Sequence, residues 1–186
     1  MFVNNLDYDD IPDKTNRFKI EAETKIKYVE ELIKNKDLNL KQYKISKKNV
    51  QTSISDIKNC IVLEDLIALS ALYKRNLIYI VNNMYLNINF GLTSGNNDYD
   101  IIIKDENNVE KIPSQLKKEE ILKNIKSEYY KIDNVTKKLK SISSYTLNEL
   151  QEKAKSLNIL IKTEEGKNKL KKDIYEEILI KLNNFK

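Results

Sequence analysis

The sequence predicts an α+β fold: a helical N-terminal part with a small antiparallel sheet, then a helix and a small C-terminal two-helix module. Apolar residues recur at helical spacing near the start and near the end of the chain, and they alternate at every second position between these parts. Helices followed by a run of strands are typical of α+β proteins. We therefore expect an α+β domain over 1–112, a helix and basic linker over 113–144, and the two-helix module over 145–186.

The first predicted helix lies in "TNRFKIEAETKIKYVEELIKN". Its apolar residues form one stripe at spacings of 4, 4, 3 and 4, namely Phe18, Ala22, Ile26, Val29 and Ile33. Asp13 or Thr15 is expected to cap its start, because both carry a side-chain oxygen that accepts from helix amides. The next segment, "DLNLKQYKIS", alternates in polarity and predicts a short strand.

The stretch "NVQTSISDIKNCIVLEDLIALSALYK" is denser in apolar residues. Ile54, Ile57 and Ile61 have helical spacing, and the part from Leu63 to Leu72 is apolar on most sides, which predicts a buried helix. Cys60 belongs to this run. We expect it to be a small buried hydrophobe rather than a catalytic thiol, because the chain has no histidine to activate it.

Alternation about Asn82-Asn83 predicts a hairpin, since asparagine tolerates the positive φ of a two-residue turn. The alternating residues on its two sides are Tyr79, Val81, Met84, Leu86, Ile88 and Phe90. A third strand, a turn at 105–108 and a fourth strand are expected in "YDIIIKDENNVEKI". Ser114 is then placed to cap a helix, whose apolar residues are Ile121, Ile125 and Tyr129. The following polar and basic residues, 131–144, read as a partly flexible linker.

The sequence lacks the residues that several kinds of metal-binding and catalytic sites need. Without histidine and with one cysteine, no Cys/His zinc site and no internal disulfide framework can form, and neither GxxxxGK[ST] nor GxGxxG occurs. A nuclease strand is also absent: Asp98, Asp100 and Lys104 stand near each other, but Ile102 occupies the position of the second carboxylate. We therefore expect a protein that is not an enzyme and uses no cofactor or metal.

No segment approaches the roughly 20 apolar residues that cross a bilayer, and the acidic start "MFVNNLDYDD" lacks the apolar region of a secretory signal. We expect an intracellular protein that does not bind membranes. The abundance of lysine, asparagine and isoleucine, with Arg17 and Arg75 as the only arginines, suggests an A/T-rich genome.

Positive charge is concentrated at the C-terminal end. Residues 131–186 hold 13 Lys against 8 Asp or Glu, a net +5, whereas the first 130 residues hold 20 basic and 20 acidic side chains. A local positive field raises the concentration of polyanions around it. The alternative interpretation is a solvated lysine-rich surface.

The C-terminal residues predict a helix, an extended connection and a second helix. Thr146 and Glu149 have the spacing of a capping box, Asn158 fits a left-handed helix end, and Gly166 fits a turn. Ile159 and Ile161 are expected to point inward from the connection. The two apolar faces comprise Leu147, Leu150, Ala154 and Leu157 on the first helix, and Leu170, Ile174, Ile178 and Leu182 on the second.

This arrangement resembles the SAP-type and Rho-termination-factor N-terminal-like modules. The matching residues are Thr146, Leu147, Glu149, Leu150, Ala154, Leu157, Ile159, Gly166, Lys167, Lys172, Ile174, Tyr175 and Ile178. Two features depart from the pattern: Asn158 stands where many members have glycine, and acidic residues in "KTEE" precede the turn. The resemblance implies binding of DNA or RNA, or, as in some members, of a protein partner.

A second resemblance concerns the middle of the chain. The stretch "LEDLIALSALYKRNLIYIVNNMYLNI" is similar to uncharacterised proteins of large cytoplasmic DNA viruses, several of which carry a C-terminal module of this kind. It transfers no catalytic motif. If the protein is viral, it implies a location in the host cytoplasm, the nucleus or the virion.

The predicted nucleic-acid site is the start of the last helix, because free helix amides and nearby lysines attract phosphate. Its residues are Lys167, Lys169, Lys171, Lys172, Gly166 and Thr146, with a second patch of Lys137, Lys138 and Lys140. We expect binding to DNA more than RNA, with little sequence specificity and strong salt dependence. The first domain is expected to hold a protein partner. The rival interpretation is a protein–protein adaptor whose C-terminal hairpin docks a partner, and the third is an enzyme of unknown type.

Overall fold

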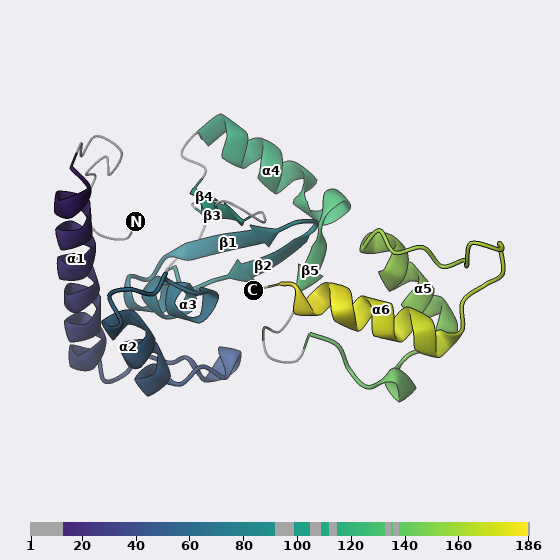
Figure 1. The fold of residues 1–186 in the computed structure, drawn as a ribbon, viewed down its shortest axis with the longest axis horizontal. Coiled ribbons are helices and arrows are strands. Elements are labelled where there is room, and N and C mark those ends of the chain that lie inside the picture. The colour runs from purple at the N-terminus through teal and green to yellow at the C-terminus, as the bar shows by residue number, and fades with distance from the viewer. Residues whose placement is uncertain are drawn as a thin grey trace. The chain divides into compact units, whose positions relative to one another are not determined.

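A computed structural model describes residues 13–91, 99–104, 109–111, 115–132, 135 and 138–185 of the chain (Figure 1). Its contacts divide it into two compact units, which comprise 1–76 with 89–96 and 77–88 with 97–186. Within the described residues there are six α-helices and five strands, so the α+β class is confirmed. None of the described helices combines the length and apolarity needed to cross a membrane.

The first unit is helical. It contains α1 (Lys14–Lys34), α2 (Lys47–Ser55) and α3 (Leu63–Leu72). The predicted cap of α1 is confirmed: the Asp13 carboxylate accepts a hydrogen bond from the Thr15 amide at 2.9 Å. The buried core of this unit consists of Tyr28, Leu32, Leu40, Val50, Ile54, Ala68 and Leu69. The buried helix predicted for residues 63–72 is therefore confirmed.

The strand predicted in "DLNLKQYKIS" is wrong. Lys41–Tyr43 form a single 3-10 turn, closed by hydrogen bonds from the Tyr43 amide to Leu40 O and from the Lys44 amide to Lys41 O. Lys44 follows in the left-handed region at φ 55°. Leu40 is the buried anchor of this segment. Alternation predicted a strand here, but no neighbouring strand lies beside the segment among the described residues, and local turn bonds satisfy its backbone instead.

The segment after α2 also differs from its prediction. The helix ends at Ser55, so Ile57 and Ile61 lie beyond it. The Lys25 ammonium, on a residue only 9% exposed, donates to the carbonyl oxygens of Asp56, Ile57 and Asn59. These contacts satisfy carbonyl oxygens that follow the end of the helix. Cys60 at the end of this segment is exposed, so the prediction of a buried cysteine is wrong.

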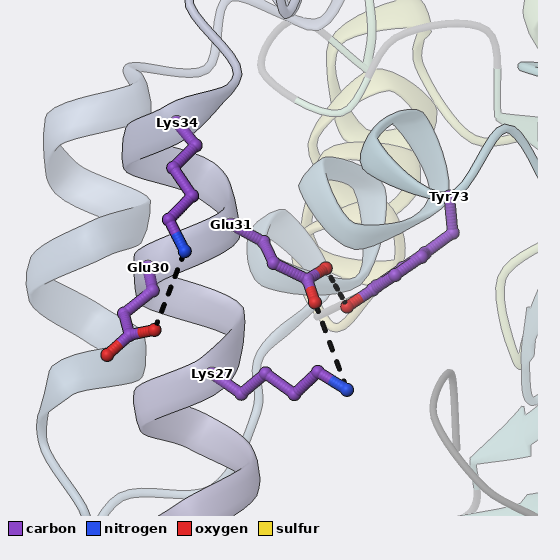
Figure 2. Close-up of polar contacts among 5 residues, drawn as sticks. All are labelled: Lys27, Glu30, Glu31, Lys34 and Tyr73. Atoms are coloured by element: carbon purple, nitrogen blue, oxygen red, sulfur yellow. Dashed lines mark hydrogen bonds and ion pairs between the residues drawn. The ribbon is translucent and has the colours of Figure 1, made fainter.

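The face of α1 that packs on the unit includes only Val29 of the predicted stripe. Tyr28 and Leu32 are buried, and Glu31 beside them accepts a hydrogen bond from the Tyr73 hydroxyl at 2.5 Å (Figure 2). Phe18 and Ile33 of the predicted stripe are 54% and 58% exposed. The helix carries two apolar lines, and the aromatic contact of Tyr28 with Tyr73, at 6.1 Å between ring centroids, belongs to the buried one.

The second unit is built on a sheet with the strand order β4-β3-β1-β2-β5 in its described part. The strands are β1 (Asn76–Val81), β2 (Met84–Ile88), β3 (Tyr99–Lys104), β4 (Val109–Lys111) and β5 (Tyr130–Ile132). The predicted hairpin is confirmed: Val81 pairs with Met84 across the turn, and Asn82 has φ 54°. Strands β3 and β4 confirm the third and fourth predicted strands. Their turn at 105–108 and the cap at Ser114 lie outside the described residues.

The sheet is mixed rather than antiparallel. Strand β5 pairs in parallel with β2, with Met84 opposite Tyr130 and Leu86 opposite Ile132. Its three residues, "YKI", are too few to show apolar residues at every second position. For this reason two of them were predicted to belong to the linker. Helix α4 (Gln115–Glu128) packs Ile121, Leu122 and Ile125 with sheet residues Ile78, Ile80, Tyr85 and Ile101, which confirms the predicted apolar face of that helix.

The observed units group residues differently from the domains predicted with boundaries at 112 and 144. Sheet, α4, linker and C-terminal helices belong to one unit. Two contacts explain the grouping. The ring centroids of Phe185 and of Tyr79 in β1 lie 5.8 Å apart in a T-shaped contact. The side chain of Leu139, in the predicted linker, is buried.

Candidate nucleic-acid interface

The first helix of the C-terminal module begins as the sequence predicts. Helix α5 (Leu147–Ser156) starts in a capping box: Thr146 Oγ1 accepts from the Glu149 amide at 3.2 Å, and Glu149 Oε2 accepts from the Thr146 amide at 2.6 Å. The helix ends where Asn158 takes the left-handed conformation at φ 57°. Both predicted ends of this helix are confirmed.

The connection between the two helices is a narrow hairpin. Lys162 and Asn168 form an antiparallel bridge, and the Lys169 amide donates to Ile161 O at 3.0 Å. The Thr163 amide donates to Lys167 O at 2.8 Å, and Gly166 turns the chain at φ 79°. The predicted turn at Gly166 is confirmed. Nothing lies within 4 Å of a Cβ built there, so its positive φ, and not crowding, favours glycine.

The helices of the module bury most of the expected residues. The fully buried side chains are Leu150, Ala154 and Leu157 of the α5 segment and Ile174, Ile178 and Leu182 of α6 (Lys171–Asn183). Leu147 and Leu170 were predicted in the same faces, but they are 40% and 71% exposed. Leu170 is the N-cap of α6, and its extended φ and ψ of −68° and 154° turn it away from the line of the helical residues.

The two helices begin close together. Hydrogen bonds from the Thr146 amide and hydroxyl lower the pKa of Glu149, and the positive charges of Lys153 and Lys171 lower it further. Lys171 is the first residue of α6, so the start of α6 lies near the first turn of α5 (Figure 1). The positive ends of the two helix dipoles then lie at one side of the module. The α5 start is capped, whereas no side chain caps α6.

Several of the predicted lysines are occupied by partners within the chain. The Lys169 ammonium lies 2.6 and 2.7 Å from the two carboxylate oxygens of Glu177, and its side chain is only 18% exposed. Lys167 pairs with Glu165 at 3.0 Å. Lys138 donates to the carbonyl oxygens of Leu182 and Phe185 at 2.9 and 2.7 Å, where it satisfies the end of α6. The fold therefore holds the ammonium groups of Lys138 and Lys169, whereas Lys167 has an exposed partner in the turn.

Three predicted lysines differ from these: Lys140 is exposed, Lys171 is half-buried and Lys172 is loosely paired. Among the described residues, the ammonium groups of Lys140 and Lys171 have no hydrogen-bond or ion-pair partner. Lys172 lies 3.8 Å from Glu176, with 77% of its side chain exposed. Lys137, the remaining predicted lysine, lies outside the described residues.

Two tyrosines bring Lys140 to the start of α6. The Tyr175 hydroxyl donates to Lys140 O at 3.0 Å, and the Lys140 amide donates to the Tyr145 hydroxyl at 3.1 Å. Tyr175 stands four residues after Lys171, and helical side chains lean toward the N-terminus of their helix. The Tyr175 hydroxyl, and with it Lys140, therefore lies over the first turn of α6. We call Lys140, Lys171 and Lys172, with the α6 start, the basic face.

Lys153 was missed by the sequence reasoning. Its ammonium lies 5.4 Å from the Tyr130 ring centroid and 5.7 Å from that of Tyr145, and it donates to the Tyr130 hydroxyl at 3.2 Å. Lys153 thus adds a charge near Glu149 and connects α5 to β5. Its spacing of four from Glu149 was the available signal.

No known protein family, curated protein or solved structure matches the chain. Among the described residues, no group of three or more acidic or cysteine side chains is placed to hold a metal ion. Asp100 of the rejected nuclease pattern is a buried residue of β3, and Asp98 lies outside the described part. Any inference about function therefore depends on the basic face.

Proposed function

We propose that this protein is a non-enzymatic nucleic-acid-associated protein, which binds DNA or RNA phosphates at the basic face of its C-terminal module. One observation carries the proposal: within the described part of the chain, the ammonium groups of Lys140 and Lys171 have no partner. Lys171 begins a helix that no side chain caps, and Tyr175 of that helix binds the Lys140 backbone. A phosphate at this place accepts hydrogen bonds from free amides and is neutralised by Lys140 and Lys171 without breaking an existing ion pair. Lys172 adds a charge whose pair with Glu176 is long and exposed.

The residue types at the face favour affinity over sequence reading. Lysine binds phosphate as a flexible point charge, whereas base edges are read mainly by arginine, asparagine and glutamine with fixed geometry. We therefore propose low sequence specificity and strong salt dependence. The resemblance to SAP-type modules favours DNA over RNA, and the resemblance to proteins of large DNA viruses favours a DNA-associated, virion, transcription or replication accessory role.

The test compares two double variants of the full chain that remove the same charge. Lys171→Gln with Lys172→Gln neutralises the basic face. Lys167→Gln with Lys169→Gln neutralises lysines that are already paired with Glu165 and Glu177. Binding to short duplex and single-stranded DNA and to RNA is measured by fluorescence anisotropy over a series of salt concentrations.

The first variant is expected to lose about one to two units of the slope of log K against log salt, since each duplex phosphate contact contributes about 0.9. The second is expected to change the slope by well under about one unit. Circular dichroism checks that both variants stay folded. Equal losses in the two variants, or no loss in either, would reject the basic face as the phosphate site.

One observation favours the adaptor alternative. Leu160 and Leu170 flank the ends of the hairpin, and they are 79% and 71% exposed. If they lie together, exposed apolar side chains of this size can form a protein-docking site. If nucleic acid fails to bind and Leu160→Ser with Leu170→Ser abolishes retention of a purified partner, the adaptor function replaces the proposal.

A further inference from the structure

We propose that α1 is a dimerisation helix, whose apolar stripe pairs with the same stripe of a second copy of this chain in antiparallel orientation. The stripe is Phe18, Ala22, Ile26, Val29 and Ile33. It lies in the first unit and goes beyond the proposed nucleic-acid binding, on which it does not depend.

The exposure of this stripe is the first reason. Phe18, Ile26 and Ile33 are 54%, 52% and 58% exposed, and the half-buried Ala22 and Val29 complete the line between them. Tyr28 and Leu32 form the face that packs on the core, and only Val29 of the stripe also contacts that core. Scattered exposed apolar residues are ordinary, but large ones that recur on one side of a helix favour an interaction surface.

The spacing of the stripe is the second reason. Its apolar residues follow nearly the same spacing from the N-terminal end as from the C-terminal end. When two copies of α1 run antiparallel about a two-fold axis near Ile26, Phe18 faces Ile33 of the second copy and Ala22 faces its Val29. Ile26 faces its own counterpart. Each large side chain then meets an apolar neighbour, and the small Ala22 admits the branched Val29. A self-complementary surface of this kind is what a two-fold dimer requires.

The charges beside the stripe are the third reason. Lys19 and Glu30 lie on the same flank of the stripe, near its two ends. In an antiparallel pair the same flanks of both helices meet, so Lys19 of each copy approaches Glu30 of the other. Both residues are in the solvent and loosely paired, Lys19 with Glu23 at 4.0 Å and Glu30 with Lys34 at 3.8 Å (Figure 2). Such weak exposed pairs are easily exchanged for contacts across an interface.

The expected association is weak. The stripe spans residues 18–33, about 22 Å of helix at 1.5 Å per residue, and a single helix face of this length buries less than the roughly 800 Å² per partner of a standard interface. Sedimentation velocity of the full chain, from low micromolar to near-millimolar concentration, is therefore expected to show a concentration-dependent monomer–dimer equilibrium. A chain that stays monomeric throughout would overturn the proposal.

Two variants locate the interface. Ile26→Glu places two carboxylates against each other at the axis and is expected to weaken dimerisation by more than about tenfold. Ile180→Glu makes the same change at an exposed isoleucine of α6, 65% exposed, and is expected to leave dimerisation unchanged. Dimerisation that survives Ile26→Glu, or that is lost equally in both variants, would contradict the assignment to α1.

A pair of charge variants tests the orientation. Lys19→Glu and Glu30→Lys are each expected to dimerise less well than the wild type, because like charges then meet. Mixed together, the two variants are expected to form a heterodimer, since the first chain then carries only negative charges at these two positions and the second only positive ones. A mixture that associates no better than its components would overturn the antiparallel register.

Disulfide trapping gives the same orientation independently. The exposed Cys60 is first replaced by serine. Ile26→Cys is then expected to cross-link to itself under mild oxidation, because the two copies approach at the axis. Phe18→Cys is expected to remain uncross-linked, since its counterpart lies about 22 Å away and a disulfide needs Cα atoms within about 7 Å. Equal cross-linking at both positions would indicate a parallel pair and reject the proposal.

Discussion

Two regions of this protein show the same sequence signal with opposite structural outcomes. In the C-terminal module, most of the apolar residues predicted on one face of each helix, Ile174 and Ile178 among them, are fully buried. In α1, the large residues of the predicted stripe are exposed, and the helix packs through Tyr28 and Leu32 instead. The helical spacing of apolar residues therefore predicts which face of a helix can be buried. It does not predict which other element packs against that face.

The difference has a physical cause in each region. The helices of the module have one apolar line each and are joined by a short hairpin, so each finds its partner in the other. Helix α1 has two apolar lines, and the one that packs carries residues the pattern did not favour: the Tyr28 ring, which lies against Tyr73, and the Lys25 ammonium, which binds backbone carbonyls. The line that faces the core is therefore the one whose side chains make both aromatic and polar contacts.

The largest expected effect comes from a matched pair of isoleucines, one in each region. Ile178→Ala is expected to destabilise its unit by about 2–5 kcal/mol, since it leaves a cavity among buried side chains. Ile33→Ala is expected to change stability by no more than about 0.5 kcal/mol, because that side chain is in the solvent. Urea unfolding at low protein concentration measures both. Similar losses at the two sites would show that the α1 stripe is buried after all.

A smaller effect is expected at the start of α5. Thr146→Ala removes the cap oxygen that accepts from the Glu149 amide, which is expected to lower stability by about 0.5–2 kcal/mol. Thr52→Ala in α2 is the control, because that exposed hydroxyl donates to the Lys48 carbonyl of its own helix and caps nothing. Thermal unfolding followed by circular dichroism separates them. If the control variant loses as much as Thr146→Ala, the capping box contributes nothing specific.

The smallest effect is a pH dependence with opposite sign in the two units. Asp65 and Glu149 both accept a hydrogen bond from the amide at the start of their helix. Burial raises the pKa of Asp65 above its ordinary value, whereas bonds from Thr146 lower the pKa of Glu149. Asp65 therefore stabilises most at low pH and loses this as pH rises through its folded pKa. Glu149 stabilises above its unfolded pKa and loses this as pH falls through its folded pKa.

Urea unfolding of Asp65→Asn and Glu149→Gln from about pH 3 to about pH 7 measures these contributions. The free energy of unfolding of the wild type minus that of Asp65→Asn is expected to fall as pH rises. The same difference taken with Glu149→Gln is expected to increase as pH rises. Two differences of the same sign would contradict the opposite environments assigned to these carboxylates.

The parts of the fold that the sequence predicted are those with strong local signals. Three local features depend on residue types that few others can replace. They are the turn at Asn82, the capping box of Thr146 and Glu149, and the turn at Gly166. Strand β5 was missed because three residues carry no period, and it pairs with a strand that lies far away in the sequence, on the other side of β3, β4 and α4. No local pattern encodes such a pairing.

The position of the candidate site stays a prediction, and the structure adds details of it that the sequence could not give. Charge counting placed it at the start of α6, where Lys171 and Lys172 lie. It could not separate them from Lys169, which has the same charge but is held by Glu177 eight residues later. Nor could it show that Tyr175 brings Lys140 to the same place, because that contact spans 35 residues.

The most direct test of the central claim removes equal charge from the two regions of the full chain. One triple variant replaces Lys140, Lys171 and Lys172 by glutamine. The other replaces Lys19, Lys27 and Lys34 of α1 by glutamine. Duplex DNA binding is measured over a salt series for both and for the wild type.

We predict that the first variant binds DNA more weakly, with a slope of log K against log salt reduced by about two to three units. The second is expected to keep the wild-type slope. If both variants lose the same amount, DNA responds to overall charge alone, and the claim that the C-terminal basic face is a binding site is wrong.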